Sequence, residues 1–139
     1  RLSPEQSSRA WRFAELLEEA IEGGHYRRHS EQIRPHYSAK ASQLQSALEM
    51  SGLKQLGWEW ARPEGGLIFW LRGPKTLDLS MSGAFCQSCI EHGVLYVPGD
   101  LCFADGLTRN CARLSTGALD SDRLQTAVER FASVAKRFA

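Results

Sequence analysis

Apolar residues recur at helical spacing in the first third of the chain and again along its last twenty residues. Ser3-Pro4 predicts the start of a first helix, and Gly23-Gly24 predicts its end. A second helix is predicted to bend at Pro35 and to end at Ser51-Gly52. The stretch 119–139 is the clearest amphipathic helix. The residues at helical spacing, which fall on one face of each helix, are Ala10, Phe13, Ala14, Leu17, Ala20 and Ile21; then Tyr26, Ser30, Ile33, Tyr37, Ala41, Leu44 and Leu48; and finally Leu124, Val128, Phe131, Ala135 and Phe138.

Shorter patterns in the middle of the chain are typical of strands. Residues 58–61 alternate, 62–66 are turn-forming, and 67–71 are a continuous apolar run. They predict an antiparallel hairpin with a five-residue connection and a second strand buried on both faces. A helix over 78–92 and strands near 94–98 and 110–117 follow. The order ααββαββα predicts an α+β domain of two layers, with helices packed on a small, mainly antiparallel sheet.

The strand NCARLSTG, residues 110–117, carries an arginine at its centre. Alternation places Ala112 and Leu114 on one face and Cys111, Arg113 and Ser115 on the other. Arg113 is then either an arginine facing solvent or a guanidinium held on a rigid strand to bind a carboxylate. These eight residues alone leave both interpretations open.

Composition and charge limit the classes of function. With 139 residues, 42% of them hydrophobic, the chain is long enough for one domain with a core. A net charge of +1 predicts no general attraction to nucleic acid or to membranes, and the apolar run 67–71 is too short to span a bilayer. The basic cluster Arg27, Arg28, His29, Arg34 and His36 is interrupted by Glu31, which favours a solvated or domain-facing helix surface over a nucleic-acid site.

The cysteines raise the question of a metal or redox site. Cys86 and Cys89 form a CxxC pair, while Cys102 and Cys111 are separated by a loop. Because the CxxC pair falls late in its predicted helix, whereas redox pairs sit at helix N-termini, we expect four reduced structural thiols and no zinc. The lack of an N-terminal signal pattern indicates a cytoplasmic protein.

The succession of segments resembles a known family. GHYRRHSEQIRPHYSAKASQLQSAL is followed by PEGGLIFWLRG, by a helix ending in HGVLYVPGD, by NCARLSTG and by the terminal helix. This succession is similar to the C-terminal small domain of fold-type I pyridoxal-phosphate aminotransferases. The subgroup it resembles contains 2-aminoadipate and kynurenine aminotransferases and the aminotransferase-like half of MocR-type regulators.

The resemblance implies a role for each part of the chain. Residues 1–24 would lead from a large domain that precedes them, and 25–139 would form the small domain. Arg113 would bind the α-carboxylate of amino-acid and 2-oxo-acid substrates. Pyridoxal 5'-phosphate would be bound by the large domain, in a protein that is a homodimer when full length. Lys40 does not match the family's Schiff-base lysine, so the piece alone would be inactive.

Two further implications stay open. The family often has a PGxxF loop, which here reads PGDLCF and is one residue longer, so Phe103 belongs either to the substrate pocket or to the core. The same small domain could also be the effector-sensing half of a MocR-type regulator, with DNA contacts made by another domain, or a stand-alone, non-catalytic interaction module.

Overall fold

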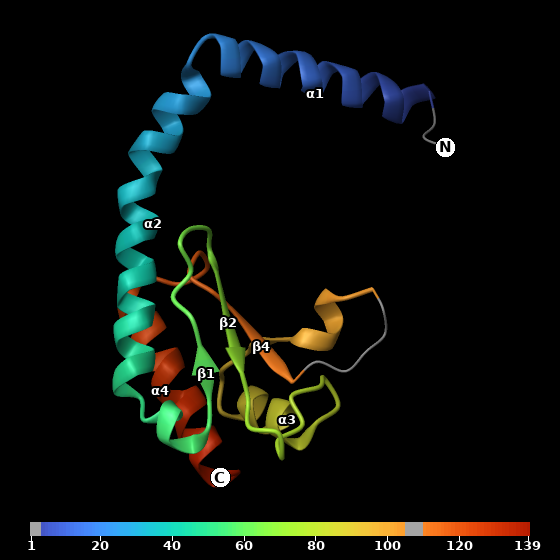
Figure 1. Ribbon diagram of the computed structural model, residues 1–139. Helices are drawn as coiled ribbons and strands as arrows, with labels where there is room; N and C mark the ends of the chain where they lie inside the picture. The colour runs from blue at the N-terminus through green and yellow to red at the C-terminus, as the bar shows by residue number, and fades with distance from the viewer. Residues whose placement is uncertain (1–3, 105–109) are drawn as a thin grey trace. The chain divides into compact units, whose positions relative to one another are not determined.

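The computed structural model describes residues 4–104 and 110–139, and it describes side chains from residue 11 onward (Figure 1). Ser3, at the predicted start of the first helix, lies outside the described residues. The order of helices and strands agrees with the sequence prediction. The elements are α1 (Pro4–Glu22), α2 (His25–Met50), the 3-10 helix η1 (Leu53–Leu56), β1 (Glu59–Trp60), β2 (Ile68–Arg72), α3 (Ala84–Glu91), β3 (Val97–Pro98), the 3-10 helix η2 (Gly99–Cys102), β4 (Cys111–Ser115) and α4 (Ser121–Arg137).

The chain divides into two compact units, Arg1–His36 and Tyr37–Ala139, so the boundary falls inside α2 just after Pro35. α1 and α2 are separated by Gly23-Gly24, and Gly24 has a φ of 70°, the left-handed conformation that glycine tolerates best. The division into 1–24 and 25–139 drawn from the resemblance stays a prediction.

The predicted apolar faces of the first two helices differ in burial between the two units. In the first unit the side chains of Phe13, Leu17 and Ile21 on α1 are exposed. On α2, which continues through Pro35, Leu44 and Leu48 of the second unit are buried. The core described below therefore belongs to the second unit.

The second unit holds a four-stranded sheet in the order β1-β2-β4-β3, and its three strand pairs are antiparallel. The predicted hairpin is confirmed as β1 and β2, although the segment between the strands runs from 61 to 67 and is longer than predicted. β4 lies between β2 and β3, so the strand that carries Arg113 is an inner strand.

The prediction that residues 67–71 are buried on both faces is wrong. Phe69 and Leu71 are buried, whereas Ile68 and Trp70 are 39% and 40% exposed. In the described unit α3 and α4 pack on one face of the sheet, and the alternation of side chains along β2 leaves every second residue on the other face. Every second side chain of this continuous apolar run is therefore exposed on the face that α3 and α4 do not cover.

The helix predicted over 78–92 is shorter than expected. α3 begins at Ala84, after a turn in which the backbone N–H of Ser80 donates to the carboxylate of Asp78 at 2.9 Å. This hydrogen bond lowers the pKa of Asp78 and holds residues 78–80 in a local turn that competes with helix. α4 starts with Asp120, whose carboxylate accepts from the N–H of Arg123 at 3.0 Å, as a helix N-cap does.

Four aromatic rings form the centre of the core. Phe131 of α4 lies edge-on to Trp58, with 5.0 Å between ring centroids, and 5.4 Å from Phe85 of α3. Tyr96 lies 5.8 Å from Phe131 and donates its hydroxyl to the carbonyl of Leu79 at 3.0 Å. Edge-to-face contacts at these distances add to the gain from burial. The cluster joins both helices to the segments that lead into β1 and β3.

Candidate functional site

Arg113 occupies the middle of β4, the inner strand of the sheet. Its Cα partner on one side is Trp70 of β2 and on the other side Val97 of β3. Residues directly opposite each other in a ladder project from the same face, so Arg113, Trp70 and Val97 share a face. Ala112 is buried on the core face, which confirms the predicted orientation of this strand.

Both ends of β4 are held to β2 by side-chain hydrogen bonds. Before the strand, the amide of Asn110 donates to the carbonyls of Gly73 and Pro74, at 3.2 and 2.6 Å. After it, buried Thr116 donates its backbone N–H and its hydroxyl to the carbonyl of Leu67, at 2.9 and 3.2 Å. A slip of one residue would therefore break four hydrogen bonds and turn Arg113 toward the core.

Arg113 is partly buried, and within the described residues its guanidinium has no hydrogen-bond or ion-pair partner. A charged group that loses water without gaining a partner is destabilised, so such a group in a folded chain is a candidate for binding an anion. The two ion pairs seen in the described residues, Arg72–Glu59 and Arg123–Asp120, involve exposed side chains instead.

Phe103 follows η2 and lies outside the core cluster. Its side chain is 42% exposed, and its ring centroid is 5.9 Å from that of Trp70. Of the two alternatives left open by the sequence, core or pocket, the core is therefore excluded. Trp70 was interpreted from the sequence as a core aromatic, and the period-two alternation along 68–72 is the signal that could have placed it on the open face.

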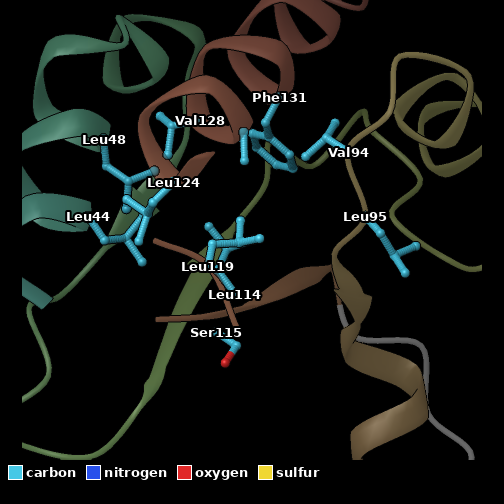
Figure 2. A pocket seen from close by; sticks show the side chains of 11 residues that line it. Leu44, Leu48, Val94, Leu95, Leu114, Ser115, Leu119, Leu124, Val128 and Phe131 are labelled. Carbon is cyan, nitrogen blue, oxygen red and sulfur yellow. The ribbon is translucent and has the colours of Figure 1, made fainter. Parts of the chain in front are cut away.

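A small cavity lies on the other side of β4, within the second unit. Leu44 and Leu48 of α2 face Leu124 and Val128 of α4, and Leu114 and Leu119 close one side (Figure 2). The cavity has a volume of about 70 Å³, and the described residues that line it are apolar apart from Ser115. A space without charged groups offers nothing to bind a substrate carboxylate, so the Arg113 face is the stronger candidate site.

Cys86 lies in the first turn of α3 and Cys89 in the second, because the helix starts at Ala84. The prediction that the pair falls late in the helix is therefore wrong for Cys86. All four cysteines of the chain are free thiols, and Cys86 and Cys89 are completely buried. Burial raises the pKa of Cys89 to about 12, and the proximity of Cys86 contributes. A thiol that stays protonated is a poor nucleophile and a poor metal ligand. Burial of Cys89 therefore argues against a redox or metal site more strongly than the position of the pair in the helix argues for one.

Because Cys89 and Tyr96 stay protonated in the fold, we expect the free energy of unfolding to fall as the pH rises above about 9. Burial raises the pKa of the Cys89 thiol from 9.0 to about 12 and raises the pKa of the Tyr96 hydroxyl as well. The unfolded chain then loses protons that the folded chain retains, which favours unfolding between these pH values. Urea denaturation with reductant, repeated from pH 7 upward, measures this slope. Cys89→Ala should flatten it, whereas buried Val134→Ala should lower stability equally at every pH; parallel curves for both variants would contradict the assignment.

Two further kinds of site are not found in the part of the chain that the structure describes. No group of three or more His, Cys, Asp or Glu side chains is arranged to hold a metal ion. Across the same residues, no helix combines the length and the hydropathy needed to cross a membrane.

The lysines do not fit the role of an anchor for pyridoxal phosphate. None of them lies on β2, β3 or β4, the strands of the Arg113 face. Lys40 lies on α2 and Lys136 on α4, Lys75 is exposed in a turn, and Lys54 places its Nζ 5.0 Å from the ring of Trp60. Among the described residues, this face thus carries an arginine without a partner but no lysine beside it.

Comparison with known proteins identifies the family. Residues 11–131 match the model of the family "Aminotransferase class I and II". The chain therefore belongs to the class I and II aminotransferase family.

The relatives are enzymes longer than this chain. A 2-aminoadipate transaminase from Thermus thermophilus is 33% identical over 121 residues, which are 87% of this chain and 29% of that protein. Aromatic-amino-acid aminotransferase 1 from Thermococcus litoralis is 27% identical over 127 residues, 91% of this chain and 28% of the relative. The crystal structure of a multiple substrate aminotransferase from Thermococcus profundus superposes with a TM-score of 0.76 at 26% identity, covering 86% of this chain and 28% of that one. The chain thus spans less than a third of these relatives.

Proposed function

We propose that this chain is the C-terminal small domain of a pyridoxal-phosphate-dependent aminotransferase, in which Arg113 binds the α-carboxylate of the substrate. The observation that carries the proposal is a partly buried arginine at the centre of a sheet in a member of this family, whose guanidinium has no partner among the described residues. Family membership supports the reaction class, and the geometry supports the role of Arg113.

Arginine suits this role better than any other side chain. Its planar guanidinium donates two parallel hydrogen bonds to a carboxylate and stays charged at any working pH. An inner strand held at both ends keeps the guanidinium in place more precisely than a loop would. Amino acids and 2-oxo acids carry the same α-carboxylate, so one arginine serves both halves of a transamination.

The cofactor belongs to the rest of the longer protein in this proposal. When bound there, pyridoxal phosphate supplies the electron sink for transfer of the amino group. The residues of this chain contribute one wall of the active site: Arg113 holds the carboxylate and thereby orients the α-carbon toward the cofactor. We further propose that the longer protein is a cytoplasmic homodimer, because the four thiols are free and the family resemblance implies a dimer.

We expect residues 1–139 alone to fold without binding pyridoxal phosphate, and the full-length protein to bind it and transfer an amino group. The reason is the lack of a lysine on the Arg113 face. The measurement is cofactor absorbance after gel filtration of both proteins, followed by addition of an amino acid and a 2-oxo acid. Cofactor retained by residues 1–139, and lost on Lys40→Ala but not on Lys75→Ala, would contradict the expectation.

The same experiment, with a measurement of DNA binding by the full-length protein added, separates the other functions that the sequence left open. A full-length protein that binds the cofactor and DNA but forms no product would be an effector-sensing regulator of the MocR type. A protein that binds neither cofactor nor amino acid would be an interaction module. Either outcome would overturn the proposed enzymatic function.

A further inference from the structure

We infer that Trp70 and Phe103 form an aromatic wall beside Arg113, which makes the site select amino acids with an aromatic or bulky apolar side chain. The inference rests on the proposed function, because it places a substrate carboxylate on Arg113. It goes further by naming the substrate class and the residues that choose it.

The geometry places the wall next to the carboxylate-binding group. Trp70 is the direct cross-strand partner of Arg113, so the indole and the guanidinium leave the same face from neighbouring strands. Phe103 approaches the indole from the segment after η2, with 5.9 Å between ring centroids and planes inclined by 42°. A substrate held by its carboxylate on Arg113 would have its side chain within reach of these two rings.

The two rings are accessible, although tryptophan and phenylalanine normally contribute to a core. Trp70 is 40% exposed and Phe103 is 42% exposed, and Ile68, two residues before Trp70 on β2, is 39% exposed. These three side chains give the Arg113 face a continuous apolar edge. Exposed apolar surface beside one unpaired cation matches a ligand with one carboxylate and an apolar body.

The charges on this face argue against a dicarboxylic substrate. A second carboxylate would need a second cation, and among the described residues of β2, β3 and β4 that cation would be Arg72. Arg72 lies opposite Cys111, on the same face, but its guanidinium is 3.7 Å from the carboxylate of Glu59 and 73% exposed. An arginine already paired and mostly in water gains little from a second anion.

The test uses the full-length protein with its cofactor bound and the substrates L-phenylalanine, L-leucine, L-alanine and L-glutamate. The reaction of each amino acid with the cofactor is followed by absorbance, without an acceptor, to give kcat/KM. Trp70→Ala should lower the ratio of L-phenylalanine to L-alanine by about tenfold or more, and Trp70→Phe should restore most of it. Phe103→Ala should lower the same ratio. Ile90→Ala is the control, because Ile90 is exposed on α3, in the helical layer on the other face of the sheet.

A binding measurement gives a second readout that needs no reaction. Titration with 3-phenylpropionate and with propionate should show tighter binding of the aromatic acid to the wild type, and Trp70→Ala should remove most of this difference. Equal binding of the two acids by the wild type would overturn the inference, as would a preference for L-glutamate. An equal loss for all four substrates in Trp70→Ala would also overturn it, because it would mean that Trp70 only packs against another part of the protein.

These outcomes are distinct from failure of the proposed function. If Arg113→Ala abolishes turnover while Trp70→Ala leaves the substrate ratio unchanged, the aminotransferase role stands and the aromatic wall is wrong. If Arg113→Ala leaves turnover of every substrate unchanged, the carboxylate-binding role is wrong, whatever Trp70 does.

Discussion

Replacing Arg113 with alanine in the full-length protein is expected to lower kcat/KM for both the amino acid and the 2-oxo acid. Loss of one partner of a buried, hydrogen-bonded charge pair costs about 2–5 kcal/mol. That cost corresponds to roughly thirty-fold to several-thousand-fold in rate. Both substrates should be affected because both present the same carboxylate to the same guanidinium, and steady-state kinetics with each substrate varied in turn measures the loss.

The accompanying variants show whether geometry or charge is responsible. Arg113→Lys keeps the positive charge but loses the two parallel donors, so it should recover only part of the rate. Cofactor affinity should hardly change in either variant, because this chain lacks a suitable lysine on the face. Arg123→Ala, which removes an exposed arginine of α4, serves as the control. An Arg113→Ala enzyme within about threefold of the wild type for both substrates, less than 1 kcal/mol, would return Arg113 to the interpretation of an arginine facing solvent.

Phe131→Ala is expected to destabilise the second unit more than any single surface change. The ring is 2% exposed and contacts Trp58, Phe85 and Tyr96 at centroid distances of 5.0, 5.4 and 5.8 Å. Removing a buried phenylalanine costs about 3–5 kcal/mol, because apolar contacts are lost and a cavity remains. Here the existing cavity of about 70 Å³, which Phe131 helps to line, would be enlarged.

Denaturant unfolding followed by tryptophan fluorescence measures this loss. Phe138→Ala is the matched control, because Phe138 follows the last turn of α4, is 39% exposed, and also contacts Phe85 at 5.5 Å. It removes the same ring type from the rim of the same cluster and should cost clearly less. Equal losses in the two variants would mean that Phe131 does not hold the core together in the way its contacts indicate.

The order of the helices and strands, and which side chains of β4 share a face, could be predicted from the sequence because both depend on local patterns. Apolar spacing along α4 identified Leu124, Val128, Phe131 and Ala135, which are buried. Alternation along 111–115 predicted that Arg113 and Ala112 project from opposite faces of the strand, as observed. These periodicities follow from the geometry of one helix or one strand and need no knowledge of what packs against it.

Where the sequence predictions were wrong, the missing knowledge concerned neighbours in space. The run 67–71 was expected to be buried on both faces, but helices cover one face of the sheet in the described unit, so Trp70 is open on the other. The start of α3 moved to Ala84 because the Asp78 carboxylate holds a turn that the apolar pattern does not reveal. That shift changed the helix position of the CxxC pair, while both thiols are buried and burial raises the pKa of Cys89.

The sequence by itself thus determined the class of fold, the family resemblance and the choice of Arg113, since these depend on residue type and order. Only the tertiary structure decided that Arg113 lies between Trp70 and Val97, that the ring of Phe103 lies near that of Trp70, and that the core belongs to residues 37–139. The physical reason is that strand register and helix packing join residues far apart in the chain. Hydrogen bonds from Asn110 and Thr116 to β2 set that register, and no local pattern of apolar and polar residues specifies them.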